Sequence, residues 1–195
     1  MKKFFATFII LVLGVAVFAS CGGGSNDEGT KPADEGQNIE QTENQTGNQN
    51  NEQTPAATFA NYAETKMLKI GLAEGWKNNT PEIPNDQQNG DIDMLSITND
   101  DGKQIALTSV KIGEIPYKVE DFVEQTKQSL TKDGISFEEA TASYAGIDYK
   151  TLAYKYEEIK VLSFFGQKNG QIITIALNGD IDATIEGMLN SVETK

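Results

Sequence analysis

Histidine and arginine are both absent from this 195-residue chain, and cysteine occurs once. The absence of histidine excludes a Ser–His or Cys–His nucleophile pair and histidine-ligated zinc or copper. The absence of arginine removes the planar group that binds carboxylates and phosphates through two parallel hydrogen bonds. A single cysteine cannot form a disulfide framework. The sequence therefore favours a binding protein over an enzyme, and we expect no cofactor.

Positive charge is also scarce, because 16 lysines face 29 acidic residues and the formal net charge is −13. Affinity for nucleic acid depends largely on lysine and arginine contacts to phosphates. We therefore expect no nucleic-acid partner.

The chain begins with a basic and then apolar segment that is typical of a secretory signal. Lys2 and Lys3 precede an apolar run of about sixteen residues, which is shorter than the roughly twenty that span a bilayer core. The run ends in Phe18-Ala19-Ser20-Cys21, which resembles a bacterial lipobox, with Phe18 where that motif usually has leucine. In such signals the cysteine receives a diacylglycerol and becomes the new N-terminus. We therefore expect residues 1–20 to be a lipoprotein signal peptide and Cys21 to be lipidated; the alternatives are an uncleaved anchor or an ordinary signal with a chance cysteine.

Residues 21–57 are polar and acidic after the cysteine. Gly22 to Ala57 contains seven acids, one lysine and no aromatic residue. A segment of this composition cannot bury enough apolar surface to order itself. We predict a disordered acidic tether that holds the rest of the chain outside the cytoplasm, on the cell membrane or, in a cell with two membranes, on the outer membrane.

Aromatic residues return at Phe59, and residues 58–195 are expected to form a single domain. The patterns predict a short helical lead-in over 58–66 and a loop over 77–91. Asp180 is expected to cap the final helix. Strands are predicted over 67–72, 92–98, 104–112, 135–143, 148–156, 159–168 and 171–177, and helices over 119–132 and 181–192.

The strand pattern predicts an α+β fold: an antiparallel sheet of about six strands flanked by helices, an α/β/α-type sandwich. Asn169-Gly170 lies between two apolar runs and is a strong hairpin signal. The strand at 171–177 is apolar on both faces, with Ile172 on one side and Ile173 on the other. Such a strand is covered from above and below.

The order of these elements resembles that of the PsbP-like family. Two motifs carry the resemblance: a Gly75-Trp76 turn after the first strand, and Gly146-Ile147-Asp148-Tyr149 at the start of the later meander. That family includes the extrinsic photosystem II protein PsbP, a Ran-GTPase nucleotide-release factor and many small bacterial lipoproteins. The resemblance covers roughly 67–192, and Ala73-Glu74 stands where a proline often precedes Gly-Trp. It implies a fold and no particular function, and histidine-based metal sites of some members have no counterpart here.

The favoured function is a non-catalytic surface lipoprotein that binds an envelope protein or component. Amphipathic aromatic residues near turns and strand ends are candidates for partner contact. An equally weighted alternative for each is that it is a partly buried packing residue. The candidates are Trp76, Tyr117, Tyr144 and Tyr149.

Two other functions stay open. A calcium- or small-ligand-binding lipoprotein would use oxygen ligands from the acidic turns, with weak candidates at Asp86, Asp91, Asp93, Asp100 and Asp101. A hydrolase without histidine would need paired carboxylates, for which Glu138-Glu139 and Glu157-Glu158 are the candidates. Adjacent residues on a strand point to opposite faces, so we expect neither pair to converge.

Overall fold

The structure is a computed structural model that describes residues 58–81, 90–113 and 117–195. The predicted signal peptide, Cys21, the acidic tether and Asp86 lie outside the described residues. None of the helices in the described ranges is long and apolar enough to cross a membrane.

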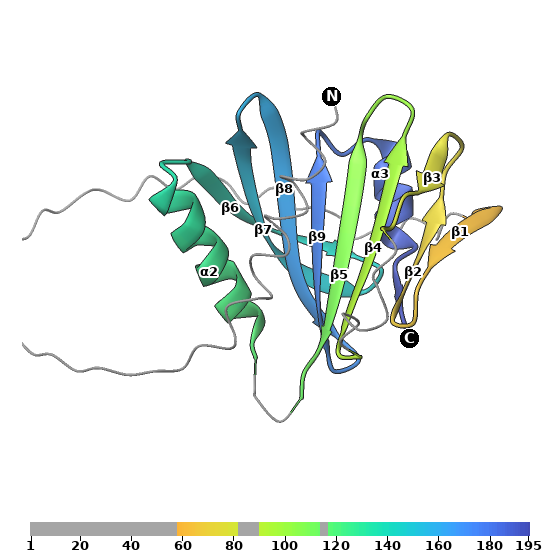
Figure 1. Ribbon diagram of the computed structural model, residues 1–195, viewed down its shortest axis with the longest axis horizontal. Helices are drawn as coiled ribbons and strands as arrows, with labels where there is room; N and C mark the ends of the chain where they lie inside the picture. The colour runs from red at the N-terminus through yellow and green to blue at the C-terminus, as the bar shows by residue number, and fades with distance from the viewer. Residues whose placement is uncertain (1–57, 82–89, 114–116) are drawn as a thin grey trace, which may run out of the picture.

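A seven-stranded antiparallel sheet forms the body of the domain (Figure 1). Its spatial order is β3-β4-β5-β9-β8-β7-β6. The Asn169-Gly170 hairpin is confirmed: Lys168 pairs with Gln171, and both turn residues have positive φ. The seven strands are β3 (Trp76–Asn78), β4 (Ile92–Asn99), β5 (Gln104–Lys111), β6 (Phe137–Tyr144), β7 (Ile147–Tyr156), β8 (Ile159–Lys168) and β9 (Gln171–Asn178).

A second, three-stranded sheet lies beside the first and has the order β1-β2-β10. It consists of β1 (Asn61–Glu64), β2 (Leu68–Leu72) and β10 (Glu193–Thr194). The helical lead-in predicted over 58–66 is therefore wrong, because β1 pairs in antiparallel register with β2. The pairing partner lies beyond a turn, and only Ala63 of the four β1 residues is buried, so the short segment carries little alternating pattern.

The helix α2 (Val119–Lys132) covers one face of the large sheet. It buries Phe122, Val123, Thr126 and Leu130, which follow one another at helical spacing. These pack with side chains of β7, β8 and β9, among them Leu152, Phe165 and Ile172. The helix ends as predicted, since Gly134 has a φ of 71° and its N–H donates to the Thr131 carbonyl.

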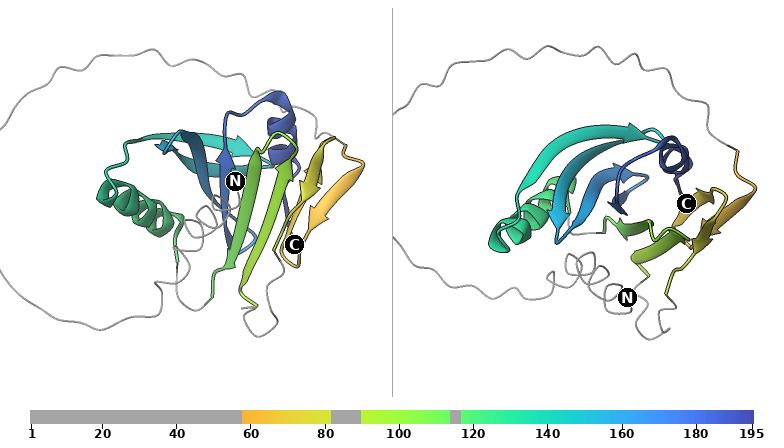
Figure 2. Two further views of the ribbon diagram at one scale, coloured as in Figure 1. Left: turned by 45° about the horizontal axis from the view of Figure 1, so that its top comes forward. Right: turned by 90° about the horizontal axis from the view of Figure 1, so that it is seen from above.

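The helix α3 (Ala183–Asn190) and the small sheet cover the opposite face. Ile173 and Ile175 of β9 pack there with Leu68, Ile70, Ile185 and Met188. Because Ile172 and Ile173 are adjacent on one strand, the two cores lie on opposite sides of the sheet. The right-hand view of Figure 2 shows α2 and α3 at separate ends of the curved sheet.

The predicted antiparallel α+β architecture is confirmed, and the count of about six strands is too low. Trp76 was expected in a turn and instead begins β3. The last helix is shorter than predicted, and its N-cap is Asp182 rather than Asp180, since the Asp182 carboxylate accepts a hydrogen bond from the Ile185 N–H at 2.9 Å. Both aspartates fit a cap by residue type, and only the backbone geometry distinguishes them.

Candidate functional site

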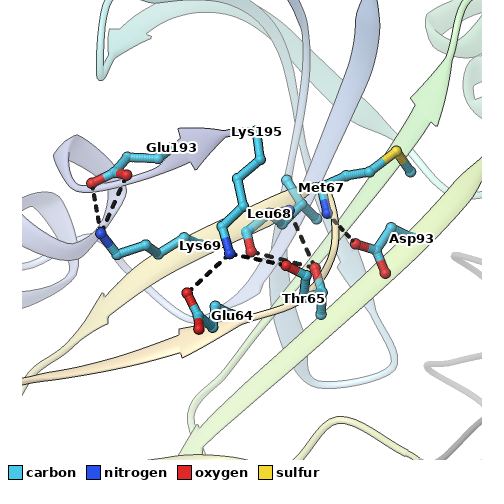
Figure 3. Close-up of polar contacts among 8 residues, drawn as sticks. All are labelled: Glu64, Thr65, Met67, Leu68, Lys69, Asp93, Glu193 and Lys195. Atoms are coloured by element: carbon cyan, nitrogen blue, oxygen red, sulfur yellow. Dashed lines mark hydrogen bonds and ion pairs between the residues drawn. The ribbon is translucent and has the colours of Figure 1, made fainter.

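A polar cluster, which we name the terminal clasp, joins the β1–β2 hairpin to the last residues of the chain (Figure 3). The Lys195 Nζ lies 2.9 Å from Glu64 Oε2 and 3.1 Å from the Thr65 carbonyl oxygen. The Lys69 Nζ lies 3.1 Å from Glu193 Oε1. The clasp consists of Glu64, Thr65, Met67, Leu68, Lys69, Asp93, Glu193 and Lys195.

Asp93 ties the clasp to the large sheet, because its Oδ2 accepts a hydrogen bond from the Met67 N–H at 2.7 Å. Its other oxygen accepts from the Met94 N–H at 3.1 Å. The hydrogen bond from Lys195 lowers the pKa of the Glu64 carboxyl. Glu64 and Glu193 thus hold segments of the small sheet together, and the contact of Asp93 makes the clasp a joint between the two sheets.

The acidic calcium candidates are not brought together. Asp91 and Asp93 lie at the start of β4, whereas Asp100 and Asp101 lie in the turn that follows its far end. Asp100 pairs with Lys77 at 2.6 Å. Within the described ranges, no group of three or more histidine, cysteine, aspartate or glutamate residues is placed to hold a metal ion.

The two carboxylate pairs also fail to converge. Glu139 on β6 lies 2.8 Å from Lys127 of α2, and Glu138 projects from the other face of the same strand. Glu157 and Glu158 form the two-residue turn between β7 and β8, in the gap between the strands predicted over 148–156 and 159–168, and Glu157 has a φ of 54°. Neither pair has the facing carboxylates that glycoside hydrolysis needs.

The four aromatic candidates occupy three separate places. Trp76 is 8% exposed and Tyr149 is 1% exposed, so both are core residues, as the packing alternative stated. Tyr117 is half-buried and packs edge-on against Phe122, beside α2. Tyr144 is half-buried at the end of β6, where its ring meets Phe164 edge-on at 6.1 Å.

The burial of Tyr149 has a clear cause in the sheet. Tyr149 of β7 pairs directly with Gly166 of β8, and the missing side chain of the glycine leaves room for the phenol ring. A Cβ added at Gly166 would lie 2.8 Å from Tyr149 Cδ1. The ring then packs edge-on against Phe164 at 6.0 Å, and burial raises the pKa of its hydroxyl well above the usual range.

Tyr144 is held at a rigid hairpin end. The Asn190 side chain of α3 accepts a hydrogen bond from the Ala145 N–H at 3.2 Å, and the Lys168 ammonium donates to the Ala145 carbonyl at 2.7 Å. Burial and the nearby Glu186 raise the pKa of the Tyr144 hydroxyl, so it stays a neutral hydrogen-bonding group at neutral pH. A half-buried tyrosine with an accessible hydroxyl-bearing ring is the type of anchor that protein interfaces favour.

Residues on the same face of β6 extend this anchor into a surface. Side chains two apart on a strand share a face, which places Glu138, Ala140 and Ala142 in line with Tyr144. Glu138 and Ala140 are exposed, and Ala142 is half-buried. We name this patch, with the adjoining Glu186, the Tyr144 surface. The sequence analysis named Tyr144 and missed its neighbours, since β6 has no alternation of apolar and polar residues that would distinguish its two faces.

No family model and no curated protein matches this chain. Among solved structures, the chain is similar to the solution structure of cyanobacterial PsbP from Synechocystis sp. PCC 6803, with a TM-score of 0.44 and 12% sequence identity. The similarity covers 66% of this chain and 86% of that one.

Proposed function

We propose that this chain is a lipid-anchored, non-catalytic lipoprotein whose folded domain binds an envelope protein outside the cytoplasm. The observation that carries the proposal is the Tyr144 surface, where a half-buried tyrosine packs on Phe164 beside exposed residues of β6, next to a turn that Asn190 and Lys168 hold by hydrogen bonds. We further propose that the domain is a PsbP-like α/β/α sandwich, because its elements follow that order and its two helices cover opposite faces of the sheet.

The lipobox-like segment supports the anchoring half of the proposal. Cys21 is the chain's only cysteine, and it lies at the end of the apolar leader. Two or more acyl chains hold a protein stably on a membrane, whereas one chain binds only marginally. Labelling with radioactive palmitate tests this directly: wild type is expected to carry label and to sediment with membranes, and Cys21→Ala to do neither.

Partner binding is tested by crosslinking the lipidated protein in its native membrane and purifying it. We expect one reproducible envelope protein to copurify with wild type and to be lost or reduced with Cys21→Ala. Tyr144→Ala should weaken capture about tenfold or more, because truncating a tyrosine that is a binding hot spot costs about 2 kcal/mol or more. The control is Tyr62→Ala, since Tyr62 is a more exposed tyrosine (42% exposed) that lies away from β6, on β1. Equal loss in both tyrosine variants, or no partner with wild type, contradicts the proposal.

A further inference from the structure

One long strand edge has no pairing partner on its outer side among the residues that the structure describes. β6 ends the seven-stranded sheet, and the only strand that pairs with it in the described ranges is β7. It has eight residues, whereas the opposite edge strand, β3, has three. In both views of Figure 2, β6 forms the outer border of the sheet.

The hairpin geometry determines which backbone groups of β6 point outward. Ala145 and Gly146 both have positive φ, 55° and 68°, which defines a two-residue type I′ turn closed by Tyr144 and Ile147. In an antiparallel pair the hydrogen-bonded residues alternate, so Ala142, Ala140 and Glu138 bond to β7. The N–H and C=O groups of Ser143, Thr141 and Glu139 therefore point away from the sheet.

This edge lacks most of the devices that usually prevent strand addition. Edge strands are commonly protected by charged side chains, lysine above all, by proline, by bulges or by shortness, and the charges of β6 are confined to Glu138 and Glu139 near its start. β6 contains no lysine and no proline, and all eight residues pair with β7 in continuous register without a bulge. The stretch Ala140-Thr141-Ala142-Ser143 carries only small side chains, which leaves its outward backbone accessible.

We propose that β6 receives an extended, lysine- or arginine-bearing segment of another protein, which pairs with Glu139, Thr141 and Ser143 as an added strand. The inference rests on the proposed binding function and names the surface that performs it. Strand addition supplies affinity through main-chain hydrogen bonds and specificity through alternate side chains. Here Tyr144 would anchor one end of the added segment.

The negative charge of the domain favours a cationic segment as the added strand. Glu139 is already paired with Lys127, but Glu138 on the other face is exposed and has no ion pair among the described residues. From Thr58 onward the chain has 22 acidic residues against 13 lysines. A cationic strand is attracted to this edge, whereas a second copy of the chain brings further negative charge and is repelled.

The test measures amide hydrogen exchange of the lipidated full chain in detergent, with and without a capped octapeptide of alternating valine and lysine. We expect exchange to slow about tenfold or more at the N–H groups of Glu139, Thr141 and Ser143, because each gains a hydrogen bond. The N–H groups of Glu138, Ala140 and Ala142 should change less, since they already bond to β7. The same peptide methylated on alternate backbone nitrogens should give no protection, and a valine–glutamate peptide should give less than the lysine peptide.

Thr141→Pro removes an outward N–H without removing a bond to β7, a position where proline is tolerated. It should abolish the protection, while the matched Thr141→Val keeps it. Glu138→Lys should invert the preference between the lysine and glutamate peptides.

Two results with the peptide would overturn the inference: binding without protection of these three N–H groups, and no protection at any soluble peptide concentration. Protection that grows with protein concentration alone would also overturn it, because it would assign the edge to a second copy of the chain. If Thr141→Pro still captures the native partner as wild type does, the binding function stands and β6 is not its surface; if wild type captures none, the binding function itself fails.

Discussion

At the scale of single residues, Gly166 shows how one missing side chain organises a core. A Cβ there would lie 2.7 Å from Ile147 Cγ2 and 2.8 Å from Tyr149 Cδ1. Gly166→Ala should therefore destabilise the domain by about 1–3 kcal/mol, the usual cost of overpacking, as measured by urea unfolding. Gly113→Ala is the matched control, because Gly113 has ordinary φ and no atom within 4 Å of an added Cβ. Equal stability of the two variants would contradict the packing described for Tyr149.

The paired surface carboxylates predict a modest pH dependence. Hydrogen bonds from Lys195, Lys150 and Lys160 lower the folded-state pKa values of Glu64, Glu120 and Asp180 respectively. The unfolded chain then binds more protons, so stability is full above pH of about 4.5 and falls as the pH drops through the lowered values. The melting temperature should fall accordingly below pH of about 4.5, and Glu64→Gln should flatten the profile. Because these groups are exposed, the effect should also shrink in high salt; a melting temperature that rises on acidification would contradict these ion pairs.

At the scale of elements, two aspartates that look alike in the sequence, Asp180 and Asp182, have different roles at the start of α3. Asp182 caps the helix by accepting the Ile185 N–H, and its pKa is lowered first by the hydrogen bond from Lys103 and then by that backbone contact. Asp182→Ala should cost about 1 kcal/mol of unfolding free energy through loss of the cap. Asp182→Asn should retain most of it, and Asp180→Ala should change little. If urea unfolding shows that Asp180→Ala loses more unfolding free energy than Asp182→Ala, then Asp180 is the helix cap, as first predicted from the sequence.

The elements that the sequence predicted well have local causes. The helix at 119–132 was predicted with its observed bounds because an apolar stripe, acidic first-turn residues and Gly134 all agree. The Asn169-Gly170 hairpin followed from two residues that accept positive φ. By contrast, β1 was missed because its strand character depends on its pairing with β2. Local signals were thus sufficient where residue types mark an element by themselves, and insufficient for β1, where the pairing decides.

The candidate site was harder to predict for the same reason. Tyr144 and Tyr149 looked equivalent in the sequence, and only the pairing with Gly166 explains why Tyr149 lies in the core. The immobilisation of Tyr144 depends on Asn190, which is far along the chain. The edge position of β6 is a property of the whole sheet order and has no signature within its own eight residues.

At the scale of the whole molecule, the terminal clasp joins the first and last strands of the described domain, β1 and β10, through β2, while β6 forms a border of the large sheet that has no second pairing strand within the described residues. The predicted lipid anchor attaches through the residues that precede β1. The domain would therefore be held by its small sheet and would offer the β6 border to partners. This arrangement is the central claim of the account.

The most direct test is site-specific photocrosslinking in the native membrane. A photoreactive amino acid is introduced at Thr141, on the outward edge of β6, or at Glu158, in the β7–β8 turn. The account predicts one defined envelope-protein adduct from position 141 and none of that mass from position 158, with the adduct lost in Cys21→Ala. The same adduct from both positions, or adducts from position 158 alone, would contradict it.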